Sequence, residues 1–166
     1  TKEEFKAELL DGLTPPPAYF PQNVMMNING YESLDSIMLK ADKPLNPKEF
    51  EAVANQTEAL ILDVRNERDF VKEHIPNSIF IGIDGGFAPW VGALIKDVKQ
   101  PILLITPQGR EEETITRLSR VGFDNTLGYL KDGLKAWKEA GFETDSLESV
   151  SPEEFASNFK DALVID

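Results

Sequence analysis

Cysteine is absent from this chain of 166 residues. The chain can therefore form no disulfide, bind no metal through a thiolate and use no thiol as a nucleophile. Histidine, the commonest metal ligand among side chains, occurs once, at His74, and no His-x-His-x-Asp-His metal motif is present. We predict no metal site and no cofactor within this chain.

Basic residues and long hydrophobic runs are also scarce. Lysine and arginine number 17 against 29 acidic residues, so the net charge is −12. Nucleic acids and anionic membranes bind basic surfaces, and this charge disfavours both as partners. No run approaches the length that spans a membrane, and no signal-peptide pattern opens the chain. We therefore expect a cytoplasmic location.

The apolar residues that are present alternate between two periodicities. Short apolar runs predict strands, and helical spacing or capping signals predict helices between them. The expected strands are 59–64, 79–81, 102–105 and 126–130, and the expected helices begin at Asn46 and Arg110 or cover 67–73, 87–95 and 134–140. This order predicts an α/β fold with a parallel sheet flanked by helices on both faces. We expect Trp90 and Trp137 in the core.

The central unit is the strand 102–105, the turn Thr106-Pro-Gln-Gly109 and the helix that follows Arg110. In such a unit, backbone N–H groups and the helix dipole create a positive potential inside the loop. The loop is a candidate cradle for a thiolate, an oxyanion or a phosphate.

Five short motifs share the order and spacing of a rhodanese domain, and the chain resembles that family over residues 46–142. The motifs are Asp63-Val-Arg65, His74-Ile-Pro76, the loop Thr106–Glu111, Gly122-Phe-Asp-Asn125 and Asp132-Gly-Leu-Lys-Ala-Trp137. The resemblance implies a rhodanese-like parallel sheet. Sulfur-transferring members carry Cys-x-x-Gly-x-Arg in the loop. Aligned on Gly109, Thr106 stands in place of the cysteine and Glu111 in place of the arginine.

This departure removes the chemistry that the resemblance would otherwise imply. Sulfur transfer needs a thiolate that can hold a persulfide, and the threonine hydroxyl is far less acidic. We expect no catalytic residue, and a relic loop made of Thr106, Pro107, Gln108, Gly109, Arg110 and Glu111. Asp63, Arg65 and Arg110 remain candidates for ligand binding, because ligands bind at the carboxyl ends of parallel strands. Asp63 and Arg65 can equally brace neighbouring loops, and His74 is expected to be structural.

Two alternatives stay open at this point. The domain can be a binding module that holds a small anion or a partner's acidic terminus with the loop amides and Arg110. It can also be an enzyme with non-thiol chemistry at Thr106 or Asp63. An anion bound to the amides of residues 107–111 would favour binding, whereas a Glu111 carboxylate folded into the loop would favour the relic.

Residues 1–45 carry a second, weaker resemblance. Thr1 and Glu4 predict a capped helix up to Leu10, and the proline-dense segment 14–21 is expected to be extended with Tyr19 and Phe20 buried. The helix, Pro16-Pro-Ala-Tyr-Phe-Pro21 and Asn27-Ile-Asn-Gly30 resemble the C-terminal end of metallo-β-lactamase-fold hydrolases fused to rhodanese domains. The resemblance implies a parent of the persulfide dioxygenase or hydroxyacylglutathione hydrolase group. Residues 1–45 would be the tail of its upstream domain, which is expected to hold zinc or iron.

The end of the chain repeats an earlier segment. Ser151-Pro-Glu-Glu-Phe155 echoes Asn46-Pro-Lys-Glu-Phe50, and Ala162–Asp166 echoes Ala59–Asp63. Such a repeat predicts tandem domains. We expect residues 143–166 to be a linker and the truncated start of a second rhodanese-like domain in a longer protein. The expected function is that of a non-catalytic module that scaffolds or orients these neighbours, and the resemblance also allows a homodimer of the parent.

Overall fold

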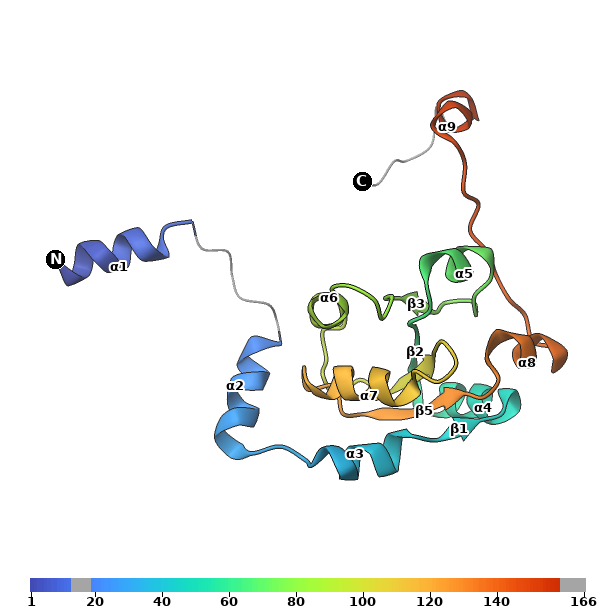
Figure 1. Ribbon diagram of the computed structural model, residues 1–166, viewed down its shortest axis with the longest axis horizontal. Coiled ribbons are helices and arrows are strands. Elements are labelled where there is room, and N and C mark those ends of the chain that lie inside the picture. Colours follow the sequence, from blue (N-terminus) through green and yellow to red (C-terminus); the bar gives the residue numbers. More distant parts are fainter. Residues whose placement is uncertain (13–18, 159–166) are drawn as a thin grey trace.

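The computed structural model describes residues 1–12 and 19–158 and contains a parallel sheet with helices on both faces (Figure 1). The strands of this sheet are β1 (Pro44–Leu45), β2 (Leu60–Asp63), β3 (Ile79–Phe80), β4 (Ile102–Ile105) and β5 (Thr126–Leu130). Their order is β1-β5-β4-β2-β3, and each neighbouring pair is parallel. The predicted α/β fold is confirmed. Within the described ranges, no helix is both long and apolar enough to cross a membrane.

Helices connect the strands of the sheet, and further helices precede β1 and follow β5 in the described residues. They are α1 (Lys2–Leu10), α2 (Phe20–Asn29), α3 (Leu34–Ala41), α4 (Pro47–Thr57), α5 (Glu67–Lys72), α6 (Phe87–Leu94), α7 (Glu111–Ser119), α8 (Gly133–Glu139) and α9 (Pro152–Asn158). Capping boxes begin α1 at Thr1 and α4 at Asn46, as predicted. α9 is the helix expected from the repeat, whereas the repeated segment 162–166 lies outside the described residues.

Strand β4 lies at the centre of the sheet and is buried on both faces. Successive side chains of a strand point to opposite faces. Ile102 and Leu104 join a core cluster with residues of α3, α6 and α7, whereas Leu103 and Ile105 join a second cluster with residues of α4 and α8. The continuous apolar run of this strand is therefore explained by its two buried faces.

Part of the segment before residue 46 packs against the sheet and its helices. Ile37 and Ala41 of α3 are buried in the first core cluster, and β1 pairs with β5. Tyr19 packs against the same cluster over Gly92, where an added Cβ would lie only 2.0 Å from the Tyr19 ring. α1, in contrast, buries no residue.

Two predictions for residues 14–21 differ from the structure: the extended conformation and the burial of Phe20. Phe20 and Pro21 begin helix α2 instead of continuing an extended segment, because a proline in the first helical turn needs no N–H partner. The predicted burial of Phe20 is also wrong, since 47% of this residue is exposed. Residues 14–18 of the expected extended segment lie outside the described residues.

The predicted burial of Trp90 is wrong as well, whereas Trp137 is in the core as expected. Phe87 and Val91 form the buried face of helix α6. Trp90 and Leu94 lie on its other face and are 60% and 52% exposed. α6 contains no charged residue. Hydrophobic periodicity therefore could not indicate which face of this helix is buried.

The contact between β1 and β5 depends on Gly128. Its φ is +150°, and an added Cβ would lie 2.7 Å from the Lys43 carbonyl oxygen, which accepts a hydrogen bond from the Tyr129 N–H. We expect Gly128→Ala to lower the free energy of unfolding by about 2 to 4 kcal/mol, through backbone strain and displacement of β1. Urea denaturation measures this change.

Gly141→Ala is the matched control, because Gly141 also has a positive φ but an added Cβ there would meet open space. It should lower the free energy of unfolding by about 1 kcal/mol. Equal losses in the two variants would contradict a steric role for Gly128.

Candidate functional site

The loop of residues 106–111 connects buried strand β4 to helix α7. Thr106 directly follows the strand and is itself buried. The Arg110 N–H donates to the Pro107 carbonyl oxygen at 3.1 Å, and Gly109 has the left-handed conformation with φ of +80°. This tight turn brings the first residue of α7, Glu111, back towards the end of β4.

The Glu111 carboxylate lies inside this loop. Its Oε1 atom accepts hydrogen bonds from the Gly109 N–H at 3.1 Å and from the Thr106 hydroxyl at 3.2 Å. These are the kinds of donor that an anion in the loop would use. Pro107 has no N–H, and the Arg110 N–H is used within the turn. The chain therefore places its own carboxylate where the sequence suggested an anion site.

Arg110 points to other carboxylates. Its guanidinium donates to Glu113 at 2.8 and 3.1 Å and to Asp84 at 2.9 Å. The hydrogen bonds to Glu113, and then to Asp84, raise the pKa of Arg110 above its ordinary value, and Arg110 in turn lowers the pKa of Glu113. The positive charge of Arg110 is thus neutralised within the chain.

The network around Arg110 includes three residues that were not among the predicted site residues: Asp84, Glu113 and Arg117. Arg117 pairs with Glu113 at 2.7 Å and donates to the Ile83 carbonyl oxygen at 2.7 Å, which ties α7 to the segment after β3. The spacing of Arg110, Glu113 and Arg117 along a helix was the available signal for these pairs. Asp84 is distant in sequence and carries no comparable signal.

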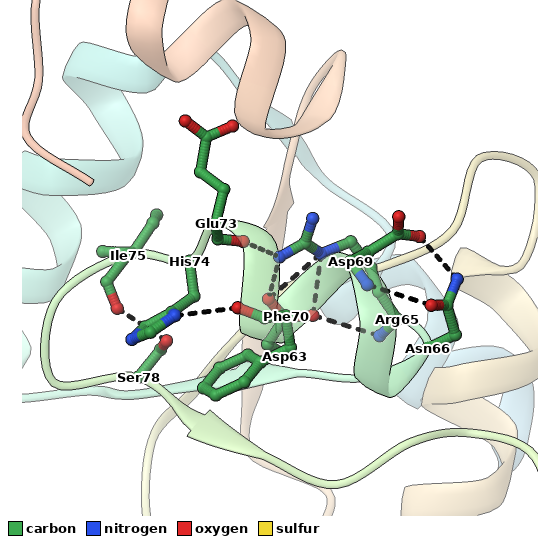
Figure 2. Close-up of polar contacts among 9 residues, drawn as sticks. All are labelled: Asp63, Arg65, Asn66, Asp69, Phe70, Glu73, His74, Ile75 and Ser78. Atoms are coloured by element: carbon green, nitrogen blue, oxygen red, sulfur yellow. Dashed lines mark hydrogen bonds and ion pairs between the residues drawn. The ribbon is translucent and has the colours of Figure 1, made fainter. Parts of the chain in front are cut away.

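Asp63 and Arg65 form a buried ion pair at the carboxyl end of β2, as Figure 2 shows. The Arg65 side chain donates to both Asp63 oxygens at 2.6 to 3.0 Å, and its backbone N–H donates to Asp63 at 3.0 Å. Arg65 also donates to the Glu73 carbonyl oxygen at 2.7 Å. The pair thereby joins β2 to the end of α5. In the described residues, no side-chain hydrogen bond or ion pair connects it with the loop 106–111.

His74 is buried beside this pair (Figure 2). Its Nδ1 atom lies 2.9 Å from the Phe70 carbonyl oxygen, and its ring stacks on Phe70 at 4.1 Å between centroids. Its backbone forms a two-way bridge with Asp145. These contacts fix the end of α5, through Phe70, and the segment at Asp145 to each other. They are the contacts of a residue that stabilises the fold.

The family model of the rhodanese-like domain matches residues 46–140. The chain belongs to the rhodanese-like domain family. A curated relative, the uncharacterized protein YibN of Escherichia coli K12, is 31% identical over 84 residues, which are 50% of this chain and 58% of that protein. The rhodanese-like domain described here thus spans little more than half of the curated relatives that it matches.

Solved structures share the fold at low sequence identity. The rhodanese-like domain of the Anabaena sp. Alr3790 protein is 21% identical with a TM-score of 0.53, over 74% of this chain and 91% of that one. A metallo-β-lactamase from Staphylococcus aureus is 22% identical with a TM-score of 0.58, over 79% of this chain and 35% of that one. A thiosulfate sulfurtransferase from Pseudomonas aeruginosa is 20% identical with a TM-score of 0.50, over 81% of this chain and 25% of that one. These identities establish the fold alone.

The loop of this rhodanese-like domain holds a threonine and a glutamate at its two ends, Thr106 and Glu111. The rhodanese-like domain contains no cysteine, which is consistent with an absence of sulfurtransferase activity. Thr106 and Glu111 are instead hydrogen-bonded to each other. The loop retains a compact shape in which a side chain of the domain occupies the centre.

The buried pair predicts a large loss of stability when its anion is removed. In Asp63→Asn, the guanidinium of Arg65, whose side chain is only 14% exposed, loses its charge partner. We expect the free energy of unfolding to fall by about 3 kcal/mol, as measured by urea denaturation. Asp11→Asn, at an exposed position on the end of α1, should change it by less than about 0.5 kcal/mol. Similar small effects in both variants would show that the pair is not a brace.

The position of the Glu111 carboxylate predicts the reactivity of a thiol placed in the loop. In Thr106→Cys, the neighbouring carboxylate should raise the thiol pKa above the value of about 8.5 for a free cysteine. Adding Glu111→Gln should lower that pKa, and adding Glu111→Arg should lower it further. The rate of iodoacetamide alkylation against pH measures each pKa without interference, because the natural chain has no cysteine. An identical pKa in all three variants would show that Glu111 does not occupy the loop in solution.

Proposed function

We propose that this rhodanese-like domain is a non-catalytic module of a larger protein, in which it scaffolds or orients the neighbouring domains of the same chain. The parent would be a metal-dependent hydrolase or a protein like the persulfide dioxygenases. In this proposal, residues 1–45 lead out of an upstream metallo-β-lactamase-like domain, and their α3 and β1 are packed into the core and sheet of the rhodanese-like domain. Residues 143–166 lead into a second rhodanese-like domain. The observation that carries the proposal is the loop filled by Glu111 in a domain without cysteine.

The contacts of the loop weigh against an enzyme with non-thiol chemistry. The Thr106 hydroxyl donates to a carboxylate that is also bonded to Gly109, and no histidine other than the buried His74 exists to act as a base. Asp63 accepts several hydrogen bonds from Arg65, so its carboxylate is already engaged. A nucleophile would need a free base and an open approach.

The same contacts weigh against a binding module for small anions. An incoming anion would have to displace Glu111 and would meet the negative charges of Glu112 and Glu113 in the first turn of α7. Arg110, the cation of the loop, is engaged with Asp84 and Glu113. Attraction for an anion is correspondingly weak.

The proposed identity of the parent rests on the resemblance of residues 1–45 to the C-terminal end of metallo-β-lactamase-fold hydrolases fused to rhodanese domains. The Staphylococcus aureus metallo-β-lactamase shares the fold over 79% of this chain, and the Pseudomonas aeruginosa thiosulfate sulfurtransferase shares it over 81%. The described residues contain no group of three or more His, Cys, Asp or Glu side chains suited to a metal. In this proposal, zinc or iron is held by the upstream domain, as the resemblance of residues 1–45 implies.

The segment that precedes the domain supports a role in positioning. Tyr19 packs over Gly92, and the Met26 sulfur lies against Gly122, so α2 is seated on the domain. The same segment also exposes apolar side chains, at Phe5 and Leu9 of α1 and at Phe20, Val24 and Ile28 of α2. Exposed apolar side chains of this kind are suited to contact with a neighbouring domain, either of the same chain or of a second copy in a homodimer of the parent.

Variants of the loop and of the contact with α2 test the proposal. In the full-length parent, Thr106→Val should leave the activity of the metal-dependent domain unchanged. In a separate assay, the present chain alone should transfer sulfur from thiosulfate to cyanide no faster than buffer does. Tyr19→Ala should lower the kcat/KM of the parent, because the contact that seats α2 is lost. A loss of activity caused by Thr106→Val in a protein of unchanged stability would refute a non-catalytic role.

A further inference from the structure

A cleft separate from the centre of the loop 106–111 lies beside helix α6. Its volume is about 340 Å3, and its lining includes Glu67, Phe80, Gly82, Asp84, Trp90 and Leu94. These residues come from the start of α5, from β3 and the segment after it, and from α6. The cleft thus lies at the β3 edge of the sheet, because β3 is the last strand in the sheet order.

The walls of the cleft are formed mainly by aromatic and aliphatic side chains. Trp90 and Leu94 are one helical turn apart on the exposed side of α6. The Trp90 indole lies against Gly86, where an added Cβ would be 3.5 Å from the ring. On the other side, Phe80 packs on Phe70 at 5.0 Å between centroids, and Phe70 stacks on His74. Aromatic side chains that border a hollow are typical anchors of protein interfaces.

The charge around the cleft indicates what kind of partner it fits. The charged residues of its lining, Glu67 and Asp84, are both acidic. Glu67 has no ion-pair partner among the described residues. Asp84 pairs with Arg110, but its side chain is 81% exposed and stays open to a second cation. The net charge of −12 favours the approach of basic partners. The apolar walls and the acidic rim therefore favour a ligand that is both apolar and basic.

We propose that the cleft binds a short segment of another protein in which large apolar residues are flanked by lysine or arginine. An apolar side chain fills the hollow between Trp90, Leu94 and Phe80, and the basic neighbours pair with Glu67 and Asp84. The indole N–H of Trp90 makes no hydrogen bond within residues 1–12 and 19–158 and is available to a backbone carbonyl of the segment. This interaction does not depend on the scaffolding role within the parent.

A labelled peptide tests the proposal directly. The probe is fluorescein-labelled Lys-Leu-Lys-Phe-Lys, and fluorescence anisotropy measures its affinity for the natural chain. Two further peptides separate the contributions, because Lys-Ser-Lys-Ser-Lys lacks the apolar side chains and Glu-Leu-Glu-Phe-Glu reverses the charge. We expect the first peptide to bind at least about ten-fold more tightly than either of the others. Equal binding of the lysine–serine peptide would overturn the proposal, because attraction would then be purely electrostatic.

Variants locate the binding to the cleft. Trp90→Ala and Leu94→Gln should each weaken binding of the first peptide by about ten-fold or more, and Glu67→Gln with Asp84→Asn should weaken it and reduce its salt dependence. Leu39→Ala is the matched control, because Leu39 is an 83% exposed apolar residue on α3, which does not line the cleft. Far-ultraviolet circular dichroism verifies folding in each case. Unchanged affinity in both Trp90→Ala and Leu94→Gln would overturn the proposal.

Discussion

The complete burial of strand β4 is the constraint on which the rest of the structure depends. Its side chains fill the core clusters on both faces of the sheet. The register of the strand and the direction of each side chain are therefore fixed. Thr106 is thereby fixed at the carboxyl end of β4, and the turn that follows must start α7 close by. The carboxyl ends of β2 and β3 meet at the same edge, which is where α/β sheets bind their ligands.

At this edge, the polar groups that sequence reasoning selected bind one another. Asp63 and Arg65 join β2 to α5, Glu111 joins Thr106 to Gly109, and Arg110 joins α7 to Asp84. Each contact satisfies groups that a substrate would otherwise use, and each also connects two segments. The edge has the architecture of a binding site, and its hydrogen-bonding groups stabilise the domain instead.

The amino-acid sequence was sufficient for elements with strong local signals. Strands β4 and β5 and the capping box at Asn46 were predictable because a continuous apolar run and a capping box have few alternative meanings. The strand β1 has only two residues and is held by a close approach to Gly128, so no periodicity reveals it. The exposure of Trp90 depends on which face of an almost wholly apolar helix meets the sheet. The pairing of Arg110 with Asp84 likewise arises only once the chain is folded.

The carboxylate of Glu111 is tethered to the loop that it fills. A tethered group acts at an effective concentration of the order of millimolar or more, so a free anion competes with a ligand that never diffuses away. Only an anion that binds much more tightly than this carboxylate could open the loop. The tether therefore favours the conformation in which Glu111 fills the loop at the end of β4 over one in which thiosulfate, phosphate or another free anion replaces it.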